Sequence, residues 1–164
     1  MYFQYPLETL ARVRGARMQA AFAQEAKEVM KDSDDVLSEP LDHGLAIFAA
    51  NEDALQQPMR ILEELYGDGI EVRRPRVRLI EGDPVQQPVM SVRVRTRRTY
   101  AAAVLQTLRL RGVKLSEECW RERELIVRGE APLASLMGLP AELDCISEGS
   151  AGHWIRLTHY APVP

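Results

Sequence analysis

The residues in this sequence best suited to binding chemistry are its arginines, because a guanidinium group forks onto phosphate or carboxylate with two hydrogen bonds. Residues 73–128 hold 14 Lys+Arg against 6 Asp+Glu, and 13 of those cations are Arg. Residues 1–72 show the reverse balance, with 6 Lys+Arg against 14 Asp+Glu. This basic middle section indicates an anionic partner; the alternative is a solvated sheet face.

One group of arginines falls on an expected strand over residues 88–97, where apolar and polar residues alternate. If this strand lies beside the last strand, over 153–160, cations and aromatic rings share the sheet face that the helices leave uncovered. The candidate residues there are Arg93, Arg95, Trp154, Arg156 and Tyr160. Such interleaving is typical of RNA-binding sheets. The alternative is that this face packs against residues 1–80 and that its arginines pair with their acids.

A second basic run lies on an expected edge strand over residues 70–80, which Pro75 interrupts. Its four arginines, Arg73, Arg74, Arg76 and Arg78, repel one another unless a partner neutralises them. They indicate contact with RNA or another phosphate backbone, or else a charged edge strand that resists aggregation. Three further cations extend this patch around the end of the expected helix over 99–111: Arg109, Arg111 and Lys114.

Residues suited to catalysis are sparse. The three histidines, His43, His153 and His159, share no metal-ligand spacing. Cys119 and Cys145 are too far apart for a zinc-binding pair and too few for a disulfide scaffold, so we expect reduced thiols. The phosphate-binding loop Gly-x-x-x-x-Gly-Lys-Ser/Thr is also missing, so we expect no nucleotide. The sequence therefore predicts a protein that is not an enzyme, with no cofactor and no metal.

Length and composition are those of a globular protein. The chain has 164 residues, of which 46% are hydrophobic and 27% charged, enough for one domain or two small ones. No apolar run reaches the roughly 18 residues that a membrane span requires, and no secretory signal is evident at the N-terminus. We expect a cytoplasmic protein without a membrane partner.

Two segments organise the expected N-terminal part. Apolar residues at near-helical spacing predict one long amphipathic helix from Pro6 to Met30, within a segment 1–35, and residues 32–44 read as a loop. A strand, a helix and a strand follow over 45–50, 51–66 and 70–80. They predict a strand–helix–strand half-domain over 36–82. Such a unit cannot close a core alone and must pack on the helix, on the C-terminal unit or on a second copy.

The C-terminal part, residues 87–164, has a more regular pattern. The expected elements are strand 88–97, helix 99–111, strands 113–122 and 124–131, helix 133–146 and strand 153–160. This βαββαβ order predicts an α+β fold in which two helices cover one face of a four-stranded antiparallel sheet. That is the ferredoxin-like arrangement.

Several short motifs in this part occur in a recognisable order. They are Pro88 and Met90, Arg111-Gly112, Pro132-Leu133 with Gly138, Gly149, and the ending His159-Tyr160 with Val163-Pro164. From Gln87 onward the chain thereby resembles the C-terminal ferredoxin-like domain of elongation factor G and related translational GTPases. The segments Gly44–Ile47, Tyr66, Val72 and Pro75–Arg78 are similar to the second half of the family's third domain.

The resemblance also has departures. The family's GTPase domain and the inserted fourth domain, expected between Val77 and Gln87, have no counterpart in this sequence. Gln87 replaces a usually acidic residue and Asp144 a usually basic one. The resemblance implies a non-catalytic module that associates with the ribosome or structured RNA. The alternative is a protein-interaction or self-assembly module, for instance a homodimer, that binds no RNA; buried ion pairs at Arg93, Arg95 and Arg156 would mark it.

Overall fold

The computed structural model describes residues 3–15 and 18–164. The chain divides into two compact units, Met1–Arg78 and Leu79–Pro164, and each unit has its own sheet and core. Within the described ranges, none of the helices combines the length and the apolar content that crossing a membrane requires.

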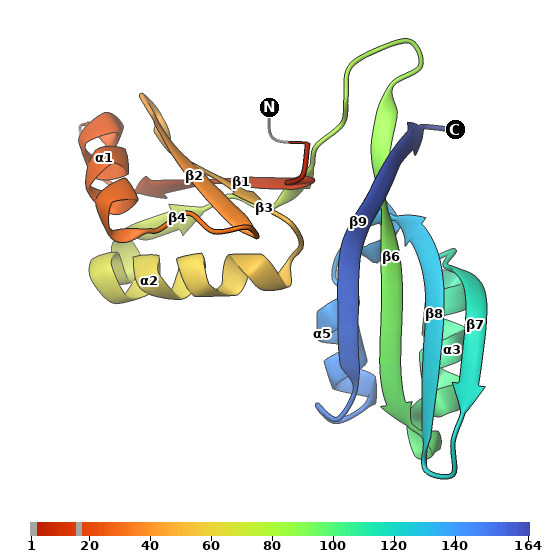
Figure 1. Ribbon diagram of the computed structural model, residues 1–164. Helices are drawn as coiled ribbons and strands as arrows, with labels where there is room; N and C mark the ends of the chain where they lie inside the picture. The colour runs from red at the N-terminus through yellow and green to blue at the C-terminus, as the bar shows by residue number, and fades with distance from the viewer. Residues whose placement is uncertain (1–2, 16–17) are drawn as a thin grey trace. The chain divides into compact units, whose positions relative to one another are not determined.

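The N-terminal unit is a complete βαββαβ arrangement (Figure 1). Its elements are β1 (Leu7–Val13), α1 (Gln19–Val29), β2 (Val36–Leu41), β3 (Gly44–Ala49), α2 (Gln56–Tyr66), β4 (Ile70–Val72) and β5 (Arg76–Val77). All strand pairs are antiparallel, in the order β2-β3-β1-β4, and β5 also pairs with β1. This order places the first strand in the middle of the sheet.

The predicted long helix from Pro6 to Met30 is wrong in its first half, where the chain forms β1. This strand has β3 on one side and β4 and β5 on the other. Leu7, Leu10 and Ala11 are all buried, although Leu10 lies on the opposite face from the other two. A strand buried on both faces loses the alternation of polar and apolar residues. Its apolar positions then imitate the spacing of a helix.

The predicted half-domain over 36–82 is also wrong, because the expected loop contains β2. Pro40 sits in this strand, which lies at the edge of the sheet where a missing N–H group is tolerated. With β1 and β2 in place, the unit closes its own core around Leu7, Leu45, Ile47 and Leu62, all at 0% exposure. The boundary between the units falls at Arg78/Leu79.

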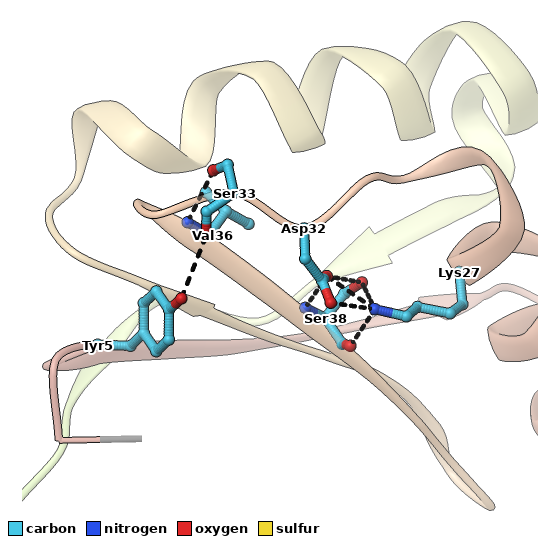
Figure 2. Close-up of polar contacts among 6 residues, drawn as sticks. All are labelled: Tyr5, Lys27, Asp32, Ser33, Val36 and Ser38. Carbon is cyan, nitrogen blue, oxygen red and sulfur yellow. Dashed lines mark hydrogen bonds and ion pairs between the residues drawn. The ribbon is translucent and has the colours of Figure 1, made fainter. Parts of the chain in front are cut away.

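A polar network fixes the connection between α1 and β2 (Figure 2). Lys27 Nζ donates to both carboxylate oxygens of Asp32 at 2.7 Å and to the Ser38 carbonyl at 2.8 Å. Asp32 Oδ1 also accepts the Ser38 backbone N–H at 3.0 Å. Tyr5 donates its hydroxyl to the carbonyl of Ser33 at 3.1 Å. These contacts bind the connecting segment to α1, to β2 and to Tyr5, which precedes β1.

The C-terminal unit has the predicted ferredoxin-like fold (Figure 1). Its elements are β6 (Gln86–Arg97), α3 (Ala101–Leu110), β7 (Lys114–Trp120), β8 (Glu124–Pro132), α4 (Leu133–Leu136), α5 (Leu139–Ile146) and β9 (Gly152–Pro162). The antiparallel sheet has the order β7-β8-β6-β9, so the first and last strands are neighbours as expected.

The predicted helix 133–146 is divided in two. Gly138 has φ 81°, a left-handed conformation that favours glycine, and it separates α4 from α5. The helix-facing side of the sheet carries Val92 and Val94, which are buried with Leu136 and Leu143. The other side of the sheet is therefore left to polar residues.

Candidate nucleic-acid interface

The sheet of the C-terminal unit has one face away from α3 and α5, which we call the open face. Successive residues of a strand point to opposite faces, so buried Val92 and Val94 place Arg93 and Arg95 on the open face. In the strand register, Arg93 lies opposite Trp154 of β9, and Arg95 lies opposite Gly152. The predicted neighbourhood of Arg93, Arg95 and Trp154 is therefore present.

Arg93 stacks on Trp154. Its guanidinium carbon lies 4.6 Å from the centre of the indole ring, a cation–π geometry. Its Nε atom is buried and finds no hydrogen-bond partner among the described residues, whereas the Trp154 side chain is 42% exposed. The aromatic ring thus orients this cation, and the ring itself remains accessible to a partner.

Arg95 and Arg156 also lie on the open face, and both are exposed. Arg95 Nε is 2.7 Å from a carboxylate oxygen of Glu124, a residue of the same unit. Arg156 lies opposite Ser91 and forms no ion pair within the described parts of the chain. Neither side chain is buried in an ion pair, which is what the self-assembly hypothesis predicts for these arginines.

Further cations complete this face, and two of them, Arg97 and Arg128, are not among the candidates predicted from the sequence. Arg97 continues the alternation of β6, and Arg128 of β8 lies opposite Arg93. Lys114, predicted as part of a different patch, joins the open face through its register with Glu130. The cations of the open face are Arg93, Arg95, Arg97, Lys114, Arg128 and Arg156, and its carboxylates are Glu117, Glu124 and Glu130. The excess of positive charge suits a phosphate backbone.

The pattern that identifies Arg128 is present in the sequence. Val127 and Gly129 on either side of it are buried, and this alternation follows the pattern used for β6. The same rule places Arg97 on this face. Because β8 pairs with β6 along nearly its whole length, its outward residues necessarily share the open face.

Tyr160 was predicted on the open face, and the structure places it elsewhere. A β-bulge between Val89 and Met90 shifts the register of β9, so that Tyr160 lies opposite Pro88, on the same face as Met90. His159 takes its place on the open face, where Nε2 is 3.9 Å from Glu130. One extra residue in a strand reverses the alternation beyond it, and a sequence pattern does not show it.

The four arginines of the predicted basic run separate into two pairs. Arg76 forms an ion pair with Glu8. Arg78 is half-buried; it lies 3.7 Å from the same carboxylate and donates to the Tyr5 carbonyl at 3.1 Å. It also stacks on Phe48 at 4.7 Å. These two arginines hold the end of the unit together.

Arg73 and Arg74 have no ion-pair partner within the described residues, and both are exposed. The main chain of Arg73 is fixed to β1, because its N–H donates to the Leu10 carbonyl and its carbonyl accepts the Thr9 hydroxyl. They line a hollow together with His43. Of the predicted basic run, these two are available to a partner.

Arg109 and Arg111 have different environments. Arg111 is half-buried, and it donates to Glu142 at 2.6 and 2.9 Å and to the carbonyls of Ser135 and Met137 at 3.2 and 2.8 Å. Arg109 is exposed, with Glu118 3.7 Å away. Arg111 is therefore engaged inside its unit, and we leave it out of the interface.

Groups suited to catalysis are not gathered anywhere in the described ranges. No cluster of three or more His, Cys, Asp or Glu side chains there could hold a metal ion. Both cysteines are free thiols at exposed positions. The most developed chemical feature is thus the arginine–tryptophan face of the C-terminal unit.

Comparison with known proteins gives two findings. Residues 85–164 match the family described as elongation factor G C-terminus. Over 98% of its length, the chain is similar in structure to a crystal structure of a protein from Thermus thermophilus, with a TM-score of 0.67 and 12% sequence identity. The chain spans 41% of the length of that protein, and at this identity the likeness shows the fold alone.

Proposed function

We propose, from the premise that residues 85–164 form an elongation factor G C-terminal domain, that this chain is a non-catalytic module that binds the ribosome or structured RNA. The binding surface is the open face of the C-terminal unit. The observation that carries the proposal is the Arg93–Trp154 stack, which sits among cations that outnumber the neighbouring carboxylates.

The chemistry of this face matches RNA in two respects. Guanidinium groups bind phosphate oxygens and release condensed counterions, which makes such binding dependent on salt. An exposed indole offers a surface for an unstacked base, as RNA-binding sheets do with their aromatic residues. The core of a protein–protein interface is typically depleted of charged residues, whereas the described open face carries six cations and three carboxylates.

The N-terminal unit supports the same function with a smaller contribution. Arg73 and Arg74 are exposed and unpaired among the described residues, so they are available to a phosphate backbone. Arg76 and Arg78 are largely occupied by Glu8. We therefore expect two useful phosphate contacts from this unit rather than the four that the arginine run suggests.

The test is co-sedimentation of the protein with ribosomes over a series of salt concentrations. One variant changes three open-face cations, Arg93→Gln, Arg97→Gln and Arg156→Gln. A matched control changes three arginines that lie outside the strands of that face, Arg98→Gln, Arg109→Gln and Arg123→Gln, so that both variants have the same net charge. We expect the first variant to lose on the order of 100-fold in affinity. The slope of log affinity against log salt concentration should become shallower by about three.

The matched control should bind within a few-fold of the unmodified protein, because its arginines do not lie on the proposed surface. Equal losses in the two variants would show that only the overall charge matters and would contradict the open face as the binding site. An absence of pelleting even at low salt would overturn the proposed function itself.

A further inference from the structure

The open face is hollowed next to Trp154. The hollow has a volume of about 330 Å³ and lies where β6 meets the start of β9. Its lining residues include Arg95, Arg97, Glu124, Gly152 and Trp154. An aromatic residue, two arginines and a carboxylate residue therefore border the same hollow.

Gly152 lines the hollow and lies against the indole ring. A Cβ atom added at this position would lie 3.4 Å from Cη2 and 3.6 Å from Cζ3 of Trp154, so the six-membered ring of the indole lies close to this glycine. Gly152 is opposite Arg95 in the register, on the open face. A larger residue there would occupy the hollow beside the ring.

The position of Arg93 leaves part of the ring uncovered. Its guanidinium lies over Trp154 but does not line the hollow. The indole therefore contacts the Arg93 guanidinium and also borders the hollow. Such an orientation, fixed before a ligand arrives, reduces the entropy that binding must overcome.

We propose that this hollow holds a single unpaired RNA base, which stacks on Trp154 while the adjoining phosphates contact Arg95 and Arg97. This inference rests on the proposed function, since it names the ligand group that the open face receives. The carboxylate of Glu124 faces the same hollow, where it can accept a hydrogen bond from an exocyclic amino group.

Other ligands fit the hollow less well. An acidic peptide side chain can pair with Arg95 and Arg97, but it has no ring that could stack on Trp154. A base inside a double helix has both of its faces covered by neighbouring bases, so it cannot stack on a protein ring. An unpaired base in a bulge or loop has a free face, and its phosphates keep the charge that the arginines require.

The test uses three RNA hairpins of equal length with one variable position: a bulged adenosine, an abasic residue at the bulge, and no bulge. The intact chain carries Trp120→Phe, so that Trp154 is the only tryptophan and reports its own contact by fluorescence. We expect the bulged adenosine to bind about tenfold more tightly than the abasic RNA, which corresponds to one stacked base. It should also quench the fluorescence of Trp154.

The structure supplies a matched control. Trp120 is 46% exposed and lies 5.2 Å from the guanidinium of Arg98, but it sits opposite Leu125, on the helix side of the sheet. Trp154→Ala should abolish the tenfold preference, and Trp120→Ala should leave it intact. Gly152→Val, which keeps Trp154 and fills the hollow, should abolish it as well; its folding is verified by circular dichroism.

The two proposals fail in different ways. If all three hairpins bind equally well and binding still depends on the open-face arginines, the base site is overturned and the proposed function stands. If the preference survives Gly152→Val, the base does not occupy the hollow, and the inference is again overturned. If none of the hairpins and no ribosome binds, the proposed function fails with it.

Discussion

Arg93 and Arg111 are both half-buried, yet their guanidinium groups have different surroundings. Arg111 donates to a carboxylate and two carbonyl groups, so its hydrogen-bonding capacity is largely used. Arg93 rests on an aromatic ring and keeps an unpaired Nε atom. A guanidinium held by a ring rather than by a carboxylate keeps its charge available to a phosphate. This difference at the level of single residues defines the proposed interface.

Asp32 is a second residue whose environment has a measurable consequence. Partial burial tends to raise its pKa, but the hydrogen bonds from Lys27 and Ser38 and the charge of Lys27 outweigh this, so its pKa is lowered. The folded state therefore prefers the ionised carboxylate more strongly than the unfolded chain does. The contacts of Asp32 in Figure 2 thus contribute more stability when Asp32 is charged than when it is protonated.

We predict that Asp32→Asn lowers the free energy of unfolding by about 1 kcal/mol at neutral pH, a modest value because the pair is partly exposed and screened by solvent. The stabilisation is fully present above the unfolded pKa of about 3.8 and is lost as the pH falls through the lower pKa of the folded state. Urea denaturation at several pH values measures this difference.

Asp34→Asn provides the control, since Asp34 is exposed in the same connection and has no hydrogen-bond or ion-pair partner among the described residues. Its stability should match that of the unmodified protein throughout the pH range. A cost of Asp32→Asn that stays constant from pH 7 down to pH 2 would contradict the assignment of the effect to the ionised carboxylate.

At the scale of elements, the Arg111 side chain joins the C-terminal end of α3 to the α4–α5 region. Arg111 follows α3 directly, and its donors reach Ser135 in α4, Met137 between the two helices and Glu142 in α5. The division of the predicted helix at Gly138 exposes the carbonyl groups that Arg111 satisfies. The break and the arginine therefore form one structural feature.

We predict that Arg111→Ala destabilises the C-terminal unit by about 2 kcal/mol, because it leaves half-buried acceptors without a donor. Arg109→Ala, which removes an exposed cation 3.7 Å from Glu118, should cost less than about 0.5 kcal/mol. Chemical denaturation of both variants decides the matter. Equal costs for the two would show that Arg111 has no special structural role.

At the scale of the whole molecule, the two units repeat one topology. The strand orders β2-β3-β1-β4 and β7-β8-β6-β9 are equivalent, since the first strand of each unit is central and pairs with its third and last strands. Each unit has fully buried side chains of its own, such as Leu62 in the first and Leu125 in the second. Because each unit has its own core, we expect the two units to unfold as separate cooperative units.

We predict that Leu62→Ala, which removes a side chain at 0% exposure, destabilises the N-terminal unit by about 3 kcal/mol through the lost burial and the cavity it leaves. Hydrogen exchange measured on the intact chain should then accelerate in the N-terminal core strands, while the amides of residues 79–164 keep their protection. Leu125→Ala should give the reverse pattern. Uniform acceleration across both units would contradict separate cores.

The sequence alone was sufficient for the strands and the strand order of the C-terminal unit. In β6 and β8 only one face is buried, so polar and apolar residues alternate and show both the strand and its orientation. That alternation is enough to place Arg93 and Arg95 on a common face. The resemblance to elongation factor G came from the same region, which the family comparison confirmed.

Only the tertiary structure decided the remainder. β1 is central and apolar on both faces, which erases the alternation, and β2 contains a proline that its edge position tolerates. The bulge in β9 displaced Tyr160 from the open face. The availability of each arginine depends on carboxylates and rings distant in sequence, such as Glu8 for Arg76. Local patterns report which face a residue occupies, whereas its partners are fixed by contacts that exist only after folding.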